Sequence, residues 1–252
     1  MISIELQYQP IGLLPWKRTI KGRFPVQYSE LNQKQFLAIT SMGEGKTDDV
    51  TFLSLMTGFS KKLIRKLGKF QQYKLFEIFE GFGIDQPHNA FIIKTIRTGG
   101  KTFLSPAPKL KGMTFGQFIF AGSLHENWSK SHTNEDLCRF VASIYLLQNE
   151  AFDENLIEPR VALLAKVNET TLDAIAANWR LIGEWLTKAY PLVFVKAEPG
   201  GKVKQVNNGW IKIFDSLVGE DIVNSDRYSK LPVNNVFRYM SERIKQNMKR
   251  KK

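Results

Sequence analysis

The sequence predicts a mainly α-helical protein of the α+β class: a helical core of two helical blocks, with an inserted β-hairpin and an extended N-terminal arm. Three observations lead to this prediction. Apolar residues recur at helical spacing behind capping residues in two long regions. A β-branched run surrounds a Gly-Gly pair between those regions, and three prolines interrupt the first 28 residues.

Residues 1–28 are expected to form the extended arm. Their three prolines disfavour a helix, because proline fixes φ and lacks a backbone N–H. An arm of this kind can order on the surface of a neighbouring subunit. The apolar residues expected to anchor it on a partner are Leu13, Leu14 and Trp16.

The first helical block follows the arm. A helix is predicted from Asp48 to Thr57, with Thr47 or Asp48 as its N-cap and Gly58 at its end. Ser60 is expected to cap the basic helix that follows. The segment 70–82 carries many apolar residues, Phe70 and Tyr73 included, and we expect them to form a broad apolar face.

The pattern then changes from helical to extended. The β-branched run of residues 91–97 is followed by Thr98-Gly99-Gly100 and a returning segment at 101–104. Two short β-branched or aromatic runs joined by a Gly-Gly turn are typical of a hairpin. The sequence therefore predicts a β-hairpin near residues 90–105.

A second helical block follows, in which Thr114 is a candidate N-cap. The predicted helices are 115–128, 134–148, 160–167 and 172–190. Residues 196–209 have the composition of a flexible linker. The predicted division is an arm at 1–28, a mainly helical core at 29–195, a linker at 196–209, and a C-terminal helical unit with a basic tail at 210–252.

Composition limits the classes of partner. The 252 residues contain 36 Lys and Arg against 24 Asp and Glu, a net charge of +12, which favours nucleic acid, a membrane surface or an acidic protein as partner. The hydrophobic content of 43% excludes a disordered chain. There is no run of eighteen apolar residues and no signal-peptide pattern, so we expect no membrane span and synthesis inside the cell.

The stretch "TSMGEGKTDD" at residues 40–49 resembles the end of a phosphate-binding loop. In the G-x-x-x-x-G-K-[ST] pattern the first glycine would fall at residue 40, which is Thr40. The preceding segment, 31–39, has the spacing of an amphipathic helix and not of a buried strand. Gly45-Lys46-Thr47 is therefore interpreted as a turn that leads into a helix cap, and no nucleotide or other cofactor is expected.

The sequence offers no catalytic or metal-binding constellation. His125-Glu126 begins like H-E-x-x-H, but residue 129 is a serine. The single cysteine, Cys138, lies in a helix-like apolar run, which is typical of a buried, unreactive thiol. We therefore predict that the protein is not an enzyme and has neither a metal site nor a cofactor site.

Two basic segments are candidate contacts for nucleic acid or an acidic partner. Basic segments can bind phosphate backbones without sequence preference, and they can also serve only as solvated surface. Both interpretations remain open. The residues concerned are Lys61, Lys62, Arg65 and Lys66, which share one helical face, and the tail residues Lys249, Arg250, Lys251 and Lys252.

The order of several short segments resembles a group of tailed-phage proteins from phages and prophages of Bacteroidetes. Residues 28–36 (YSELNQKQF) are similar to their "W-x-E-L-T-x-x-Q-F" openings, and 52–60 (FLSLMTGFS) to their "L-x-x-L-T-G-[IV]-[SP]" turn. Residues 113–118 (MTFGQF) resemble their "M-T-F-G-Q-[FW]" helix start. Residues 209–217 and 231–237 are similar to a C-terminal pattern of the group.

This resemblance implies a structural or tail-assembly-chaperone-like protein. The function expected from it is a non-enzymatic structural or assembly role in the tail, neck or connector of a phage, with other phage structural proteins as partners and a ring-like homo-oligomer as the assembled form. The chain would lie in the virion, or in the host cytoplasm during assembly. A tail assembly chaperone absent from the mature particle and a basic nucleic-acid-binding protein are the alternatives.

Overall fold

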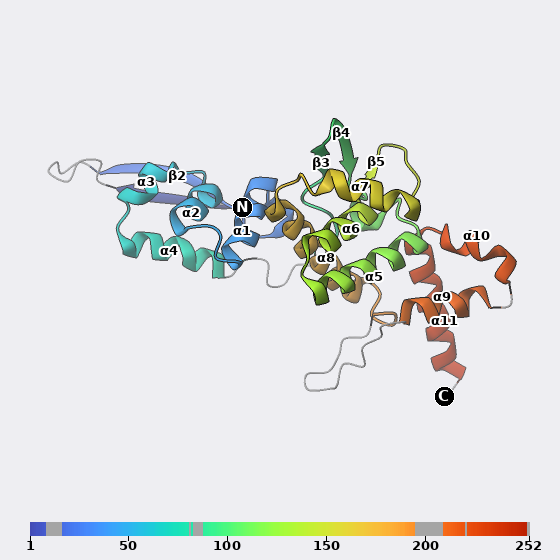
Figure 1. Ribbon diagram of the computed structural model, residues 1–252. Helices are drawn as coiled ribbons and strands as arrows, with labels where there is room; N and C mark the ends of the chain where they lie inside the picture. Colours follow the sequence, from blue (N-terminus) through green and yellow to red (C-terminus); the bar gives the residue numbers. More distant parts are fainter. Residues whose placement is uncertain (9–16, 81, 83–87, 195–208, 220, 251–252) are drawn as a thin grey trace. The chain divides into compact units, whose positions relative to one another are not determined.

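The computed structural model describes residues 1–8, 17–80, 82, 88–194, 209–219 and 221–250 (Figure 1). The chain divides into two compact units, unit 1 from Met1 to His88 and unit 2 from Asn89 to Lys252. The described residues form eleven α-helices and two small β-sheets. The predicted fold class, mainly α with a small β component, is therefore confirmed.

Unit 1 begins with a two-stranded antiparallel ribbon. Strand β1 (Ile2–Tyr8) pairs with β2 (Arg18–Phe24), and the two strands lie side by side in Figure 1. Ile4 and Phe24 point inward and are buried, whereas Lys21 on the other face is exposed. The two described strands of the predicted arm are thus extended as expected, but they pair with each other and contribute to the core of unit 1. The anchor residues Leu13, Leu14 and Trp16 lie outside the described residues.

Four α-helices complete unit 1, and local capping chemistry starts three of them. Asn32 forms a capping box with Gln35, Asp48 accepts a bond from the Thr51 N–H, and Ser60 accepts one from Leu63 N–H. These side chains satisfy N–H groups that a helix start leaves without an intrahelical partner. The helices are α1 (Gln33–Gly43), α2 (Asp49–Thr57), α3 (Lys61–Lys66) and α4 (Lys69–Glu80).

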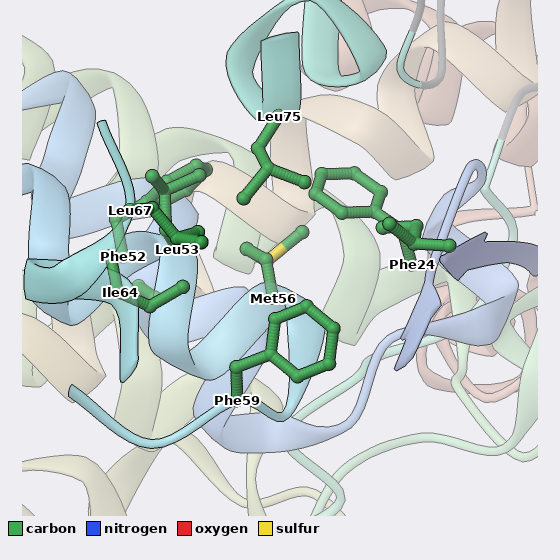
Figure 2. Packing of buried hydrophobic residues seen from close by; sticks show 10 residues of the cluster. Phe24, Phe52, Leu53, Met56, Phe59, Ile64, Leu67 and Leu75 are labelled. Carbon is green, nitrogen blue, oxygen red and sulfur yellow. The ribbon is translucent and has the colours of Figure 1, made fainter. Parts of the chain in front are cut away.

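The core of unit 1 joins the ribbon to helices α2, α3 and α4. Figure 2 shows Phe24 of β2 with Met56 of α2, Phe59 and Leu75 of α4 within one apolar cluster. The Phe79 ring meets both Phe24 and Phe52 edge-on. Because apolar burial is the dominant favourable term in folding, this cluster is what holds the ribbon on the helices.

The expected hairpin opens unit 2. Strands β3 (Thr95–Thr98) and β4 (Lys101–Leu104) pair around Gly99 and Gly100, whose φ values are +55° and +71°. Two successive residues with positive φ suit the twist of a two-residue hairpin loop, and glycine adopts them without strain. A short third strand, β5 (Leu146–Leu147), pairs with β4; it lies inside the segment predicted as helix 134–148, and α6 ends before it.

Four helices pack beside this sheet, and the central one is α6 (Asn134–Ile144), which contacts the other three. All residues of α6 from Phe140 to Ile144 are buried. The other helices of this group are α5 (Phe115–Ser131), α7 (Ile157–Leu164) and α8 (Glu169–Ala189). Each predicted helix of the second block thus exists, with its ends shifted by a few residues.

The C-terminal helices belong to unit 2 as well. Phe237 is fully buried, with its ring centroid 5.1 Å from that of Phe118 and 5.0 Å from that of Phe194. Phe118 lies on α5, so aromatic packing fixes the last helix to the second helical block. The helices are α9 (Gly209–Val218), α10 (Ser225–Ser229) and α11 (Val233–Arg250), and short 3-10 turns lie at Tyr28–Glu30, Pro108–Leu110, Glu154–Leu156 and Ile222–Asn224.

The division of the chain differs from the predicted one. A mainly helical core was expected over residues 29–195 and a C-terminal helical unit over 210–252, whereas the boundary between the two compact units falls at His88 and Asn89. The only linker that composition indicated is the segment 196–209, and all of it except Gly209 lies outside the described residues. The division depends on which apolar faces pack together, and this cannot be read from local composition.

Candidate partner-binding surfaces

The structure separates the two groups of predicted contact residues. Lys61, Lys62, Arg65 and Lys66 are exposed on α3 of unit 1. Lys249 and Arg250 are exposed in the last turn of α11 in unit 2, and Lys251 and Lys252 lie outside the described residues. The two groups therefore belong to different units of the chain.

The cations of α3 face outward because the opposite side of this helix is anchored in the core. Ile64 and Leu67 are buried in the unit 1 cluster. The side chain of Ser60 accepts a hydrogen bond from Leu63 N–H at 3.2 Å and starts the helix. A six-residue helix with one buried side leaves its remaining residues to solvent.

A glutamine on α4 fixes the junction between α3 and α4. The side-chain amide of Gln72 donates to the carbonyls of Ile64 and Leu67 at 3.0 and 3.1 Å. These carbonyls belong to the end of α3, where helix geometry leaves acceptors without partners. Nearby, the backbone N–H of Gly68 donates to the Gln71 side chain at 3.2 Å. The junction is therefore held by several hydrogen bonds as well as by packing.

The outer face of α4 carries two exposed aromatic rings. Phe70 is 71% exposed and Tyr73 is 56% exposed, whereas Leu75 is buried. Phe70 and Tyr73, both counted in the broad apolar face expected over 70–82, thus lie on the side of α4 away from the core. The helix turns Leu75 and Phe79 toward the core, and residues at i and i+3 on the opposite side share the outer face.

Exposed lysines lie on α4 together with the two rings. The Lys74 ammonium lies 5.6 Å from the Phe70 ring centroid and 2.6 Å from a carboxylate oxygen of Glu77. The hydrogen bond to Glu77 raises the pKa of Lys74, so it stays charged. We call the set formed by Lys61, Lys62, Arg65, Lys66, Lys69, Phe70, Tyr73 and Lys74 the α3–α4 patch; all of its members are exposed.

A groove between α9 and α11 forms the second candidate surface. Its volume is about 510 Å³. Ile213 and Leu217 of α9, one helical turn apart, and Met240 and Ile244 of α11, also one turn apart, supply its half-buried apolar residues. The exposed cations Lys212 and Arg243 lie on the same lining, and the Arg243 guanidinium sits 5.7 Å from the Tyr239 ring centroid.

The charge of α11 around this α9–α11 groove is strongly positive. Only Glu242 carries a negative charge between residues 238 and 250. The cations in this half of α11 are Arg238, Arg243, Lys245, Lys249 and Arg250. The predicted contact residues Lys249 and Arg250 therefore continue the basic side of a helix that also carries an apolar stripe at the groove.

The strongest ion pairs elsewhere have a structural role. Arg139 of α6 contacts Glu135 and Asp136 on its own helix and Glu158 of α7, with 2.7 Å to Glu158, and these contacts raise the pKa of Arg139. Arg160 is buried, 2.7 Å from Glu150 and 3.1 Å from the carbonyl of Ala142. These pairs join segments of unit 2 around α6 and α7.

Unit 2 also buries a cysteine and a tyrosine. Cys138 is buried, and burial raises the pKa of its thiol, as expected for an unreactive cysteine. Burial also raises the pKa of Tyr145, whose hydroxyl donates to the carbonyl of Ile93. Among the residues that the structure describes, there is no group of three or more His, Cys, Asp and Glu placed to hold a metal ion.

The stretch that resembles a phosphate-binding loop forms a turn and a cap. Gly45 has a φ of +70°, and the Lys46 N–H donates to the carbonyl of Ser41 at 2.8 Å. The Lys46 ammonium contacts Glu44 at 3.0 Å. Asp48, one of the two candidate caps, is the N-cap of α2. The interpretation of residues 45–48 as a turn leading into a helix cap is confirmed.

None of the described helices has both the length and the apolar composition needed to cross a membrane. Comparisons of the chain with protein-family models, with curated proteins and with solved structures find no match.

Proposed function

We propose that the chain is a non-enzymatic structural or assembly protein of a tailed phage, which acts in the tail, neck or connector through protein contacts. The resemblance of its segments to tailed-phage proteins supports the phage assignment. The proposed mode of action, binding of a partner protein, rests on the α9–α11 groove. Its proposed occupant is an acidic, amphipathic segment of a neighbouring phage structural protein.

Shape and charge both favour this occupant. Apolar residues one helical turn apart on α9 and on α11 form a strip that matches the apolar face of a helical segment, as in helix-in-groove recognition. Lys212 and Arg243 then lie where carboxylates of the partner would pair with them. A strongly basic helix repels a basic segment, so charge complementarity selects an acidic one.

Self-association belongs to the same proposal. Phage rings are homo-oligomers, and closed symmetry requires that each subunit present complementary surfaces. We expect the purified chain to form an oligomer in size-exclusion chromatography with light scattering, at both low and high salt. A monomer under both conditions would contradict the proposed homo-oligomeric state.

The groove is tested with particles of the phage or prophage that encodes the chain. Ile244→Glu places a carboxylate on the apolar strip, and we expect it to abolish incorporation of the chain into particles. Gln246→Glu adds the same charge at an exposed residue of the same helix outside the groove lining and should be incorporated normally. Mass spectrometry of purified particles measures how much of each variant is incorporated.

The same measurement decides between a virion component and a chaperone. If the wild-type chain is missing from finished particles but is required for their assembly, the chaperone alternative is correct. If Ile244→Glu and Gln246→Glu are incorporated equally, the groove is not the contact surface, whatever the role of the chain.

A further inference from the structure

We infer that the α3–α4 patch binds single-stranded nucleic acid, with bases stacked on Phe70 and Tyr73 and phosphates held by the surrounding lysine and arginine side chains. This surface belongs to unit 1 and is distinct from the α9–α11 groove of unit 2. The inference therefore does not depend on the function proposed above.

The exposure of the two rings is the first observation. A phenylalanine that is 71% exposed and a tyrosine that is 56% exposed lie one turn apart on the same face of α4. Their Cβ atoms are expected to lie about 5–6 Å apart. Single exposed apolar residues are common on protein surfaces, but two neighbouring rings among cations form the kind of platform on which bases stack.

The arrangement of charge is the second observation. Six cations belong to the patch: Lys61, Lys62, Arg65, Lys66, Lys69 and Lys74. Lys66 and Lys69 are three residues apart, so their Cα atoms lie within about 11 Å of each other. Lys74 contacts the carboxylate of Glu77, and Lys61 contributes to the lowered pKa of Asp48, which is lowered mainly by its hydrogen bonds with Thr51. The six cations of the patch thus outnumber these two carboxylates, and one of them, Lys74, lies over the Phe70 ring.

The patch is also preorganised. Ile64, Leu67 and Leu75 fix α3 and α4 in the core, and Gln72 ties the two helices together. Binding therefore costs mainly side-chain ordering on the protein side, which preserves affinity. This rigidity suits stacking, because the backbone that carries the two rings does not have to form on binding.

The form of the nucleic acid follows from access to the bases. In a duplex the bases are stacked inside the helix, and their faces cannot reach rings on an exposed helix surface. An unpaired strand presents a π-face on every base and tolerates any sequence. DNA and RNA share this chemistry, so either can supply the strand, and the experiment has to compare them.

The test measures fluorescence anisotropy of labelled 20-nucleotide oligo-dT, 20-nucleotide oligo-U and a 20-base-pair duplex with the full chain, at 50 and 200 mM KCl. We expect an unpaired strand to bind at least tenfold more tightly than the duplex, and binding to weaken as salt rises. Tighter binding of oligo-U would identify RNA as the preferred strand, and tighter binding of oligo-dT would identify DNA.

Variants separate stacking from charge. Phe70→Ala with Tyr73→Ala should weaken single-strand binding by about tenfold or more, in line with the stacking loss seen per base, and should leave the salt dependence unchanged. Lys62→Glu with Arg65→Glu should weaken binding and reduce its salt dependence. Tyr239→Ala removes an exposed aromatic ring beside cations on α11 and is the matched control, with no expected effect.

Three results would overturn the inference. The first is equal affinity for the duplex and the single strands, unaffected by loss of Phe70 and Tyr73. The second is an equal loss of affinity in Tyr239→Ala, which would place the site on unit 2. The third is tighter, ring-dependent binding of polyglutamate or of phosphatidylserine vesicles, which would show that the patch serves an acidic protein or a membrane surface. Matching thermal unfolding of all variants establishes that the comparison is made on folded protein.

Discussion

The side-chain amide of Asn178 on α8 makes two hydrogen bonds to the backbone of residues 90–92. Its carbonyl oxygen accepts the Ile92 N–H at 2.8 Å, and its NH₂ donates to the carbonyl of Ala90 at 2.9 Å. Asn178 is almost completely buried. A buried backbone group without a partner costs free energy, so this side chain supplies the hydrogen bonds that the segment before β3 would otherwise lack.

Replacing Asn178 should destabilise unit 2 strongly. Asn178→Ala leaves the Ile92 N–H and the Ala90 carbonyl without partners and creates a cavity, and we expect a loss of about 2–4 kcal/mol in the free energy of unfolding. Urea unfolding followed by circular dichroism measures it. A loss below about 1 kcal/mol would show that solvent or other groups satisfy this backbone equally well.

The isosteric change Asn178→Asp sharpens the test. Aspartate keeps the acceptor for Ile92 but, when ionised, loses the donor for Ala90 and becomes a buried charge. Burial raises the pKa of such a carboxyl group. The protonated form can donate to Ala90 again, so this variant should gain stability relative to wild type as pH falls. A relative stability independent of pH would contradict this account.

Truncation of a side chain should destabilise the protein far more on the buried side of α4 than on its exposed side. Leu75→Ala opens a cavity in the unit 1 core and should cost about 2–5 kcal/mol of unfolding free energy. Phe70→Ala removes a larger side chain that is mostly exposed, and it should change stability by no more than about 0.5 kcal/mol. The same denaturant titration compares them. Similar losses in both variants would mean that Phe70 is buried after all.

Features decided by local chemistry were predictable from the sequence. Asp48 and Ser60 cap helices because a short oxygen-bearing side chain meets N–H groups two or three residues away. Gly99 and Gly100 form the hairpin turn because that backbone conformation suits glycine. The outward position of Lys61, Lys62 and Arg65 follows from the same reasoning, since charged side chains are rarely buried without partners.

Features decided by packing between distant segments were not predictable. The pairing of Asn178 with Ile92 spans 86 residues, and the pairing of β1 with β2 depends on the helices that cover Ile4 and Phe24. The apolar pattern of 70–82 does not show which of its residues face the core, so the exposure of Phe70 could not be predicted. The one usable signal was the number of apolar residues in 70–82, which exceeds what one stripe can bury.

The α9–α11 groove was likewise out of reach, because it exists only where two helices meet. Its sequence signal is the spacing of Met240, Ile244 and Met248, four residues apart on a basic helix. Such a stripe indicates an apolar contact surface. The stripe alone does not predict which element packs against it. It also does not predict that part of the stripe stays half-buried at a groove.

The turn at residues 43–48 gives a third prediction. Because Lys46 follows a turn and contacts Glu44, wild type and Lys46→Ala should both show no change in melting temperature on addition of ATP and Mg²⁺. Asp48→Ala removes the acceptor for the Thr51 N–H and should lower the melting temperature. Differential scanning fluorimetry measures all three proteins. An ATP-dependent increase in wild type that disappears in Lys46→Ala would restore the nucleotide-binding interpretation.

The last prediction concerns His125 on α5 and its dependence on pH. Its ring packs against Phe140, with centroids 4.9 Å apart, and against Trp128, and its Nε2 is buried without a hydrogen-bond partner among the described residues. Burial, with a smaller contribution from the charge of Arg180, lowers the pKa of His125 to about 4. The folded protein therefore excludes a proton that the unfolded chain binds below its ordinary pKa of about 6.5.

Stability supplied by neutral His125 is complete above pH 6.5 and is lost as pH falls from 6.5 toward 4, because only the unfolded chain gains the proton over that range. After allowing for the partial exposure of the ring, the expected loss is about 2 kcal/mol. His125→Phe keeps the ring and removes the titration, so the difference in unfolding free energy between wild type and this variant should change by that amount between pH 7 and pH 4. A difference that stays constant would show that His125 is protonated in the folded protein, which requires an acceptor or water at its Nε2.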